Sequence, residues 1–431
     1  MAVLPQAADS VAVPAITLDQ ALEIALSENV SVKVADLEVQ RSAYAKKGAY
    51  AALFPQIEAN AAYQRTIQKQ KMYVDIPGME DGMEVGRWNT WSAGASLAMP
   101  LVNAQLWESL KISGQSVELA VEKARDSRLS MVTQVKSAYY AVLLAKEVRQ
   151  VYARVYENAE ANLKQVQMRY NAQKASELEL VRAKANLAGA IPNKNDSETA
   201  VSLALWQLKA VMGVSLDEEI DVVGSLDDYA GQMLRDISAA DTLSLSGNSS
   251  LKQLELQSEQ LASNIKAQQY AYIPTLSLGL NYSINAIDNT FDFNEYKWSP
   301  YSYVGLTLRI PIFSGGKRYA DIKQTRIQKA ELELSRLDTE RQLRILVRSC
   351  LKTMETNMRT YHAAQDAVTT AQKAYDIATQ SFNVGRSTIT DLNDAQLVLV
   401  QSELNVTQAL YSFLVAKAQL EQTLGYDFTQ Q

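Results

Sequence analysis

The chain has 431 residues, with 42 lysines and arginines against 48 aspartates and glutamates, and a formal net charge of −6. Glycine and proline are scarce, at 17 and 9 residues, a composition that favours long helices over a loop-rich fold. The acidic balance argues against a phosphate-binding surface, so nucleic acid is not an expected partner. The single cysteine, Cys350, cannot form an internal disulfide.

The first residues, Met1–Pro5, are not followed by the basic and apolar segments of a signal peptide. We therefore expect any export signal to lie outside the printed sequence. No window of 18 apolar residues occurs, so no transmembrane helix is predicted. A membrane protein with this sequence would have to be a closed β-barrel, because lipid leaves no other way to pair the backbone groups.

An internal repeat organises the chain. The segment from Ser27 to Tyr63 matches the segment from Ser246 to Tyr282. Farther along, the same order of residues recurs 212 positions later, with Asn171, Leu180, Ala183 and Gly213 matched by Asn383, Leu392, Ala395 and Gly425. Such self-similarity indicates a duplication, so both halves should contain the same elements in the same order.

Each half reads as helix, strand, loop, strand, very long helix, tight turn and shorter helix. In the first repeat (16–213), the expected elements are an opening helix from Thr17 to just before Pro55, strands at about 56–66 and 88–102, a long helix at 103–170 and a return helix at 176–212. In the second repeat (246–425), they are an opening helix, strands at about 275–286 and 300–313, a long helix at 314–382 and a return helix at 387–424. Residues 1–15 should be extended, while 214–245 and the tail 426–431 break the helical pattern.

The return helices carry a heptad seam. Large residues recur every seventh position, and a small one follows each of them three residues later: Leu392, Leu399, Val406, Phe413 and Leu420, followed by Ala395, Ser402, Ala409, Ala416 and Thr423. This pattern predicts knobs-into-holes packing of closely spaced helices. An ordinary helical bundle explains it equally well, so a soluble coiled-coil scaffold or a periplasmic adaptor protein stays open as an alternative.

The strand segments alternate between apolar and small or polar residues, as in Leu276, Leu278 and Leu280 against Ser277, Gly279 and Asn281. Strands of this kind suit a bilayer wall around a wet lumen. Aromatic residues near the far strand ends suit an interfacial girdle: Tyr63, Trp88, Trp91, Tyr282, Trp298 and Tyr301. Four strands cannot close a barrel in lipid, so copies of the chain must pool them, giving eight strands in a dimer or twelve in a trimer.

Enzyme chemistry is not expected. The one histidine, His362, lies beside Tyr361 in a helical pattern. No carboxylate pair with catalytic spacing, cysteine partner or glycine-rich phosphate loop accompanies it. We expect no cofactor and no metal.

Several segments resemble the TolC family of outer-membrane channels over residues 16 to 425: the opening Ile16–Leu26, the prolines Pro55 and Pro274, and the turn Phe382–Asp394. The resemblance implies a mostly α homotrimer with one shared twelve-stranded membrane barrel, a coiled-coil tunnel of twelve helices in the periplasm of a Gram-negative bacterium, and an equatorial collar at 214–245. It also implies partners: outer-membrane lipid, a periplasmic adaptor (a membrane fusion protein) and an inner-membrane transporter of RND, ABC or MFS type. The exported cargo would be drugs, other small molecules or proteins.

The same resemblance places a gate at the hairpin tips. Asp391 and Asp394 match two carboxylates that ring the narrowest point, and their spacing puts them on one helix face. Three copies would bring six carboxylates together, which favours cations. A solvated acidic helix N-terminus is the alternative interpretation.

Phe382 matches a gate position that is usually tyrosine, so one hydrogen bond should be lost. Glu179 matches an acidic gate partner, with Tyr170 at the start of its turn. The expected basic position holds Ser387, and Arg386 precedes it. The turn residues expected to contact the adaptor are Gln173, Lys174, Ala175, Ser176, Val384, Gly385 and Ser387.

Overall fold

A computed structural model describes residues 14–73, 83–232, 244–292 and 294–426. Most of the expected N-terminal segment 1–15, part of 214–245 and nearly all of the tail 426–431 lie outside these residues. The chain divides into two compact units, and each draws on both repeats. The hairpin unit comprises Met1–Glu38, Ala120–Leu254 and Ser335–Gln431, and the sheet unit comprises Val39–Leu119 and Glu255–Leu334.

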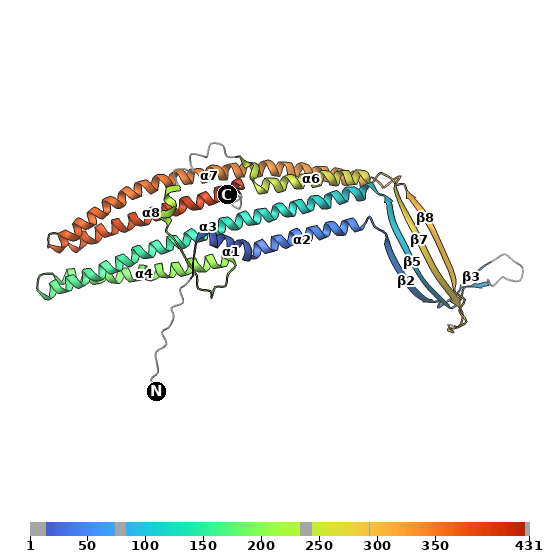
Figure 1. The fold of residues 1–431 in the computed structure, drawn as a ribbon, viewed down its shortest axis with the longest axis horizontal. Helices are drawn as coiled ribbons and strands as arrows, with labels where there is room; N and C mark the ends of the chain where they lie inside the picture. Colours follow the sequence, from blue (N-terminus) through green and yellow to red (C-terminus); the bar gives the residue numbers. More distant parts are fainter. Residues whose placement is uncertain (1–13, 74–82, 233–243, 293, 427–431) are drawn as a thin grey trace, which may run out of the picture. The chain divides into compact units, whose positions relative to one another are not determined.

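The sheet unit contains a four-stranded antiparallel sheet in the order β2-β5-β7-β8 (Figure 1). Its strands are β2 (Gln56–Arg65), β5 (Asn89–Val102), β7 (Thr275–Asp288) and β8 (Ser299–Arg309), and a short pair, β3 (Gln70–Met72) and β4 (Met83–Val85), lies in the first loop. The four predicted strands are confirmed. The predicted end of the last one at 313 was wrong, because Pro311 has no N–H to donate to a ladder.

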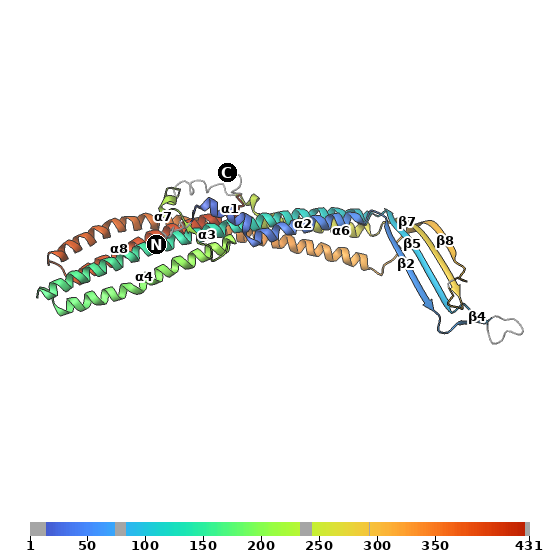
Figure 2. The ribbon, with the colours of Figure 1, turned by 60° about the horizontal axis from the view of Figure 1, so that its bottom comes forward.

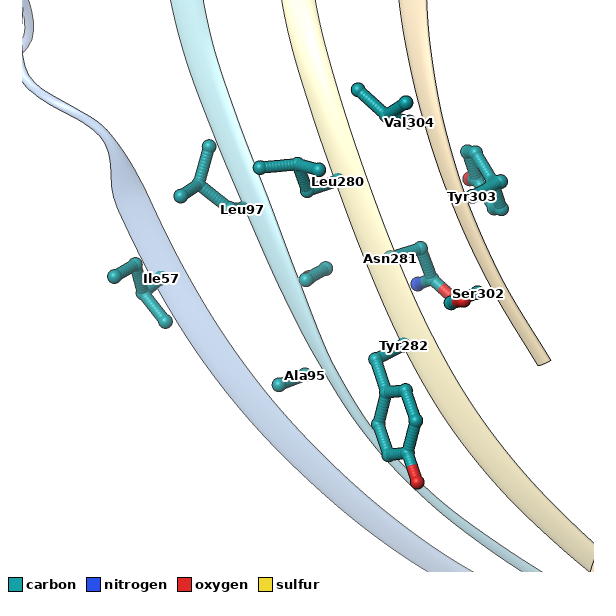
Figure 3. Close-up of a pocket in the computed structure, with 10 residues that line it drawn as sticks. Ile57, Ala95, Leu97, Leu280, Asn281, Tyr282, Ser302, Tyr303 and Val304 are labelled. Atoms are coloured by element: carbon teal, nitrogen blue, oxygen red, sulfur yellow. The ribbon is translucent and has the colours of Figure 1, made fainter. Parts of the chain in front are cut away.

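The register gives the sheet one apolar face. Ile57 pairs with Leu97, Leu97 with Leu280 and Leu280 with Val304, so one apolar row crosses all four strands (Figure 3). Tyr301 pairs with Ser283, which alternates with Tyr282 and therefore lies on the polar face. Its expected place in the girdle is corrected, because the girdle residues Tyr63, Trp91 and Tyr282 all share the apolar face.

Two helical hairpins dominate the hairpin unit, and Figures 1 and 2 show the two helices of each hairpin running side by side. The hairpins are α3 (Ala104–Asn171) with α4 (Glu177–Met212), and α7 (Lys317–Asn383) with α8 (Ile389–Leu424). All four helices were predicted to within a few residues. Among the described helices, none combines the length and the apolar character needed to cross a membrane.

The opening helix of the first half is not continuous as expected. It divides into α1 (Leu18–Glu28) and α2 (Val30–Ala51) at Asn29, whose backbone is extended. The Asn29 side chain accepts the Ser31 N–H at 2.8 Å and donates to the Val211 carbonyl at 2.6 Å. It therefore caps the next helix and ties it to the end of α4. In the second half α6 (Ser249–Tyr270) begins after Asn248, which donates to Thr423 O at 2.7 Å in the same way.

Part of the segment that links the two halves packs against α3. We call residues 221–232 of this segment the strap. Strand β1 (Ala15–Ile16) pairs in parallel with β6 (Asp221–Val222), and the short helix η1 (Leu226–Gln232) follows. The strap is held by donors and acceptors of α3: the Tyr139 hydroxyl donates to Val223 O at 2.6 Å, Lys146 Nζ donates to Val222 O at 2.8 Å, and Glu147 Oε1 accepts the Leu226 N–H at 2.8 Å.

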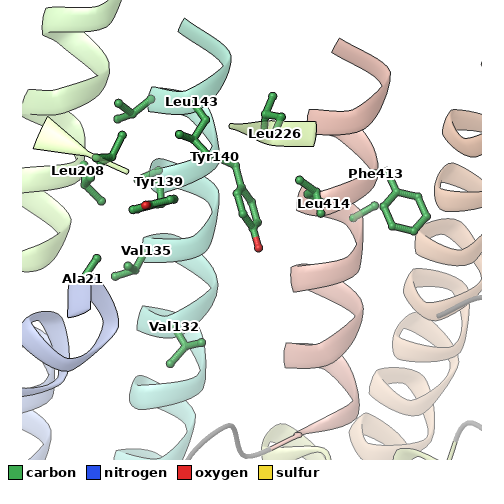
Figure 4. Packing of buried hydrophobic residues seen from close by; sticks show 14 of the residues in the cluster. Ala21, Val132, Val135, Tyr139, Tyr140, Leu143, Leu208, Leu226, Phe413 and Leu414 are labelled. Carbon is green, nitrogen blue, oxygen red and sulfur yellow. The ribbon is translucent and has the colours of Figure 1, made fainter. Parts of the chain in front are cut away.

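The main core of the hairpin unit lies under this strap. It includes Tyr139, Leu208 and Phe413, which come from α3, α4 and α8 (Figure 4). Leu226 of the strap is fully buried in the same cluster. Side chains from both repeats thus share one core, so neither half can bury its apolar surface without the other.

Candidate gate at the hairpin tips

The two tips have the same backbone turn. Gln173 and Gly385 occupy equivalent positions with left-handed φ values of 58° and 76°. One residue later, the Lys174 N–H donates to Arg169 O and the Arg386 N–H donates to Ser381 O, both at 2.8 Å. These bonds close the helix ends as Schellman-type caps. The repeat has therefore preserved the turn although glycine stands at only one of the two left-handed positions.

Each return helix then begins with a capping box. At the first tip, the Glu179 carboxylate accepts the Ser176 N–H at 2.9 Å and the Ser176 hydroxyl accepts the Glu179 N–H at 3.2 Å. At the second tip, Asp391 and Thr388 make the same pair of bonds at 2.8 and 3.2 Å. The Glu179 and Asp391 carboxylates thus satisfy backbone donors that a helix start leaves unpaired.

This capping role distinguishes Asp391 from Asp394, the two aspartates for which the resemblance implied a gate. The Thr388 N–H and hydroxyl both donate to the Asp391 carboxylate and hold its pKa below the ordinary value. Asp394 is exposed, and no described residue of the chain forms an ion pair or side-chain hydrogen bond with it. The two carboxylates predicted to share one helix face therefore differ: Asp391 is a capping group, whereas Asp394 is engaged by no described side chain.

A small apolar cluster joins the two hairpins behind the turns. Its members are Val166, Leu180, Ala183, Phe382, Ile389 and Leu392. Phe382, where the family resemblance implied a gate tyrosine, is only 3% exposed. The ring is therefore a packing residue between hairpins, and at this depth a tyrosine hydroxyl would need a buried partner.

Polar contacts reinforce the cluster from one side. The Arg169 guanidinium lies 4.9 Å from the centre of the Phe382 ring and donates to Asn383 O at 2.5 Å. Farther along, Arg182 donates to the Thr390 hydroxyl at 3.0 Å. We call these contacts the tip clamp. Sequence reasoning missed Arg169, because its contact with Phe382 joins residues far apart in the sequence and depends on how the hairpins pack.

The remaining predicted gate and tip residues lie in the turns or, for Tyr170, at the end of α3. Arg386 is exposed, and within the described part of one chain no ion pair links it to Glu179, whose carboxylate is engaged by Ser176. Tyr170 is 38% exposed. The Ser387 hydroxyl donates to Ala378 O at 3.4 Å. Residues Gln173, Lys174, Val384 and Gly385 are exposed.

A family model described as outer membrane efflux protein matches residues 21–214 and 242–426. Outer membrane protein TolC of Vibrio cholerae is 22% identical over 379 residues, covering 87% of this chain and 82% of that protein. The alkaline protease secretion protein AprF of Pseudomonas aeruginosa is 23% identical, covering 77% and 69%. The CmeC outer membrane channel of Campylobacter jejuni superposes with a TM-score of 0.75 at 17% identity, covering 95% of this chain and 85% of that one.

The family model covers well over half of the chain, once for each sequence repeat. The chain belongs to the outer membrane efflux protein family. It is accordingly a channel protein of the Gram-negative outer membrane that acts in an export system, with its helices in the periplasm. The scaffold and adaptor alternatives are thereby set aside.

Proposed function

We propose that three copies of this chain form a passive, gated duct, which carries small molecules or proteins from an inner-membrane transporter and a periplasmic adaptor to the cell exterior. The observation that supports this proposal is that the two edge strands of the sheet, β2 and β8, are each paired on one side only. An unpaired edge in lipid leaves backbone donors and acceptors unsatisfied at several kcal/mol each. Three copies can pair every edge in one closed sheet of twelve strands.

The hairpin tips would form the periplasmic entrance. Asp394 is the exposed carboxylate at the start of α8, and three copies of it would make that entrance cation-selective. Asp391 would contribute less, because its charge is shared with the Thr388 donors. The exposed turn residues, among them Lys174, Val384 and Arg386, would contact the adaptor.

Planar-bilayer recording of the reconstituted full chain tests the gate. We expect Asp394→Asn to lower the cation-over-anion permeability ratio and to weaken block by multivalent cations. Asp196→Asn, which removes an exposed carboxylate in the middle of α4, is the matched control and should change neither. A selectivity that survives Asp394→Asn would refute the assignment, and a chain that forms no channel at all would refute the assembly.

A further inference from the structure

At the strand ends away from the helices, the character of the side chains on the apolar face changes from one row of paired residues to the next. Tyr63 and Trp91 pair in one row. The next row on the same face contains Arg65, Asn89 and Asp288. Along one face the side chains therefore change from aliphatic to aromatic to charged, which is the order met on passing from the hydrocarbon region of a bilayer to its headgroups.

The aromatic row is built as a fixed cluster. The rings of Tyr63 and Trp91 lie 4.3 Å apart, and Phe291, from the loop after β7, lies 5.9 and 6.0 Å from them. The buried Asn89 amide holds the cluster in place, because it accepts from the Tyr63 hydroxyl at 2.8 Å and donates to Thr290 O at 2.7 Å. The loop is thereby folded onto the apolar face.

Three cations lie in the strand ends and the loop next to this row. Arg65 follows Tyr63 on the same face, Lys69 Nζ lies 4.5 Å from the centre of the Trp88 ring, and Arg87 lies within electrostatic reach of Asp288. Asp288 attracts Arg87, and one of its two carboxylate oxygens accepts bonds from the N–H groups of Asn289 and Thr290 and from the Thr290 hydroxyl at 2.6 to 3.0 Å. We call Arg65, Lys69 and Arg87 the basic rim.

We propose that the basic rim binds the phosphate groups of a lipid in the outer leaflet of the outer membrane, whose acyl chains lie against the apolar rows. The rim offers three cations beside the single Asp288 carboxylate, so positive charge is in excess there, and the aromatic and aliphatic rows continue directly from it. Free phosphate could use the cations but not the apolar rows. The inference rests on the proposed assembly in so far as this face must point toward lipid.

Native mass spectrometry of the full-length channel, titrated with diphosphoryl lipid A or with the same lipid after its phosphates are removed, tests the proposal. We expect wild type to bind the phosphorylated lipid more tightly, with an affinity that falls as salt screens the charges. The triple variant Arg65→Gln, Lys69→Gln, Arg87→Gln should lose roughly fivefold for each charge removed. Lys69→Gln alone gives a readout if the triple variant folds poorly.

The matched control is the variant Arg344→Gln, Lys352→Gln, Arg359→Gln, which removes three exposed cations of α7. It should bind as wild type does. Equal binding by the rim variant, equal binding of the dephosphorylated lipid, or full competition by millimolar inorganic phosphate would overturn the lipid site. Bilayer conductance of the same samples separates the two proposals, since a conducting rim variant with unchanged lipid binding refutes only the lipid site.

Discussion

The two hairpin tips have the same turn and the same helix cap, but they differ in the side chains through which they contact each other. Both turns, both capping boxes and both left-handed positions are retained. The clamp residues are not, because Arg169 and Arg182 have Ser381 and Asp394 as their repeat counterparts. The backbone turns and capping bonds are thus the same in both copies. The side-chain contacts differ, because the first hairpin supplies the arginine donors and the second supplies the acceptors.

This difference has a consequence for the proposed trimer. If hairpins of neighbouring subunits alternate in a ring, the second hairpin of one subunit lacks the groups to clamp the first hairpin of the next, because the donor positions hold a serine and an aspartate there. We therefore expect the two hairpins of one subunit to be joined more tightly to each other than to those of neighbouring subunits.

The largest effect is expected where the end of each return helix meets the opening helix of its own repeat. Gly213 and Gly425 end α4 and α8 with φ values of 78° and 74°. A Cβ on Gly425 would overlap the Gly247 carbonyl, whereas one on Gly213 would lie 2.8 Å from Glu28 O. Gly425→Ala should therefore cost about 2–5 kcal/mol, from the left-handed backbone plus the overlap, and more than Gly213→Ala.

Thermal unfolding followed by the helical circular dichroism signal measures both variants. Gly189→Ala is the control, because no heavy atom lies within 4 Å of the place that its new methyl group would occupy and the residue is inside α4. It should stabilise the helix by about 0.5–1 kcal/mol. Equal losses at Gly213 and Gly425 would show that the left-handed backbone, and not the overlap, decides the cost.

The second effect concerns the tip clamp. Arg169→Ala removes the contact with the Phe382 ring and the bond to Asn383 O. A loss of about 1–2 kcal/mol should speed hydrogen exchange at residues 381–388 roughly 5- to 30-fold. Ser381→Ala, at the repeat counterpart, should leave exchange in 169–176 unchanged. Unaltered exchange in the Arg169 variant would mean that the apolar cluster alone joins the hairpins.

Patterns that are local in sequence predicted most of this fold. The alternation of Leu276, Leu278 and Leu280 determines which face of β7 is apolar, and the repeat of Asn171 as Asn383 places both turns. The break at Asn29 was missed, because the apolar pattern runs through it and the reason for the break is a distant acceptor, Val211 O.

The site was predicted less completely, and for two different reasons. Thr388 and Asp391 have the spacing of a capping box, so the role of Asp391 was accessible in principle from the sequence. The contact of Arg169 with Phe382 was not, because it joins residues more than two hundred positions apart and depends on how the hairpins pack. The gate and adaptor roles of the tip residues remain predictions.

The third and smaller effect concerns Glu147 of α3, which accepts a bond from the strap. At the equivalent position of α7 the residue is Arg359. Burial raises the Glu147 pKa, the Leu226 N–H opposes that rise, and Asp227 and Asp228 add to it. A raised folded pKa means that stability present below the unfolded pKa is lost as pH rises through the folded value. Glu147→Gln removes this loss.

Melting of Glu147→Gln and wild type at several pH values measures the effect as a difference. The variant should be the more stable at neutral pH, by less than about 1 kcal/mol because an amide accepts a weaker bond than a carboxylate. The advantage should disappear once the pH falls below the ordinary glutamate pKa. An advantage that is independent of pH would contradict the assignment to Glu147 ionisation.

The last effect tests the residue that occupies the left-handed position of each turn. Gln173 adopts a φ of 58° where the second tip has Gly385, and a side chain makes that conformation costly. Gln173→Gly should stabilise the first turn by about 0.5–1 kcal/mol, measured as slower hydrogen exchange at 172–176. The reverse change, Gly385→Gln, should speed exchange at 384–388 by a similar factor. Opposite shifts of equal size would establish that the turns are equivalent, and that the hairpins differ only in the side chains with which they meet.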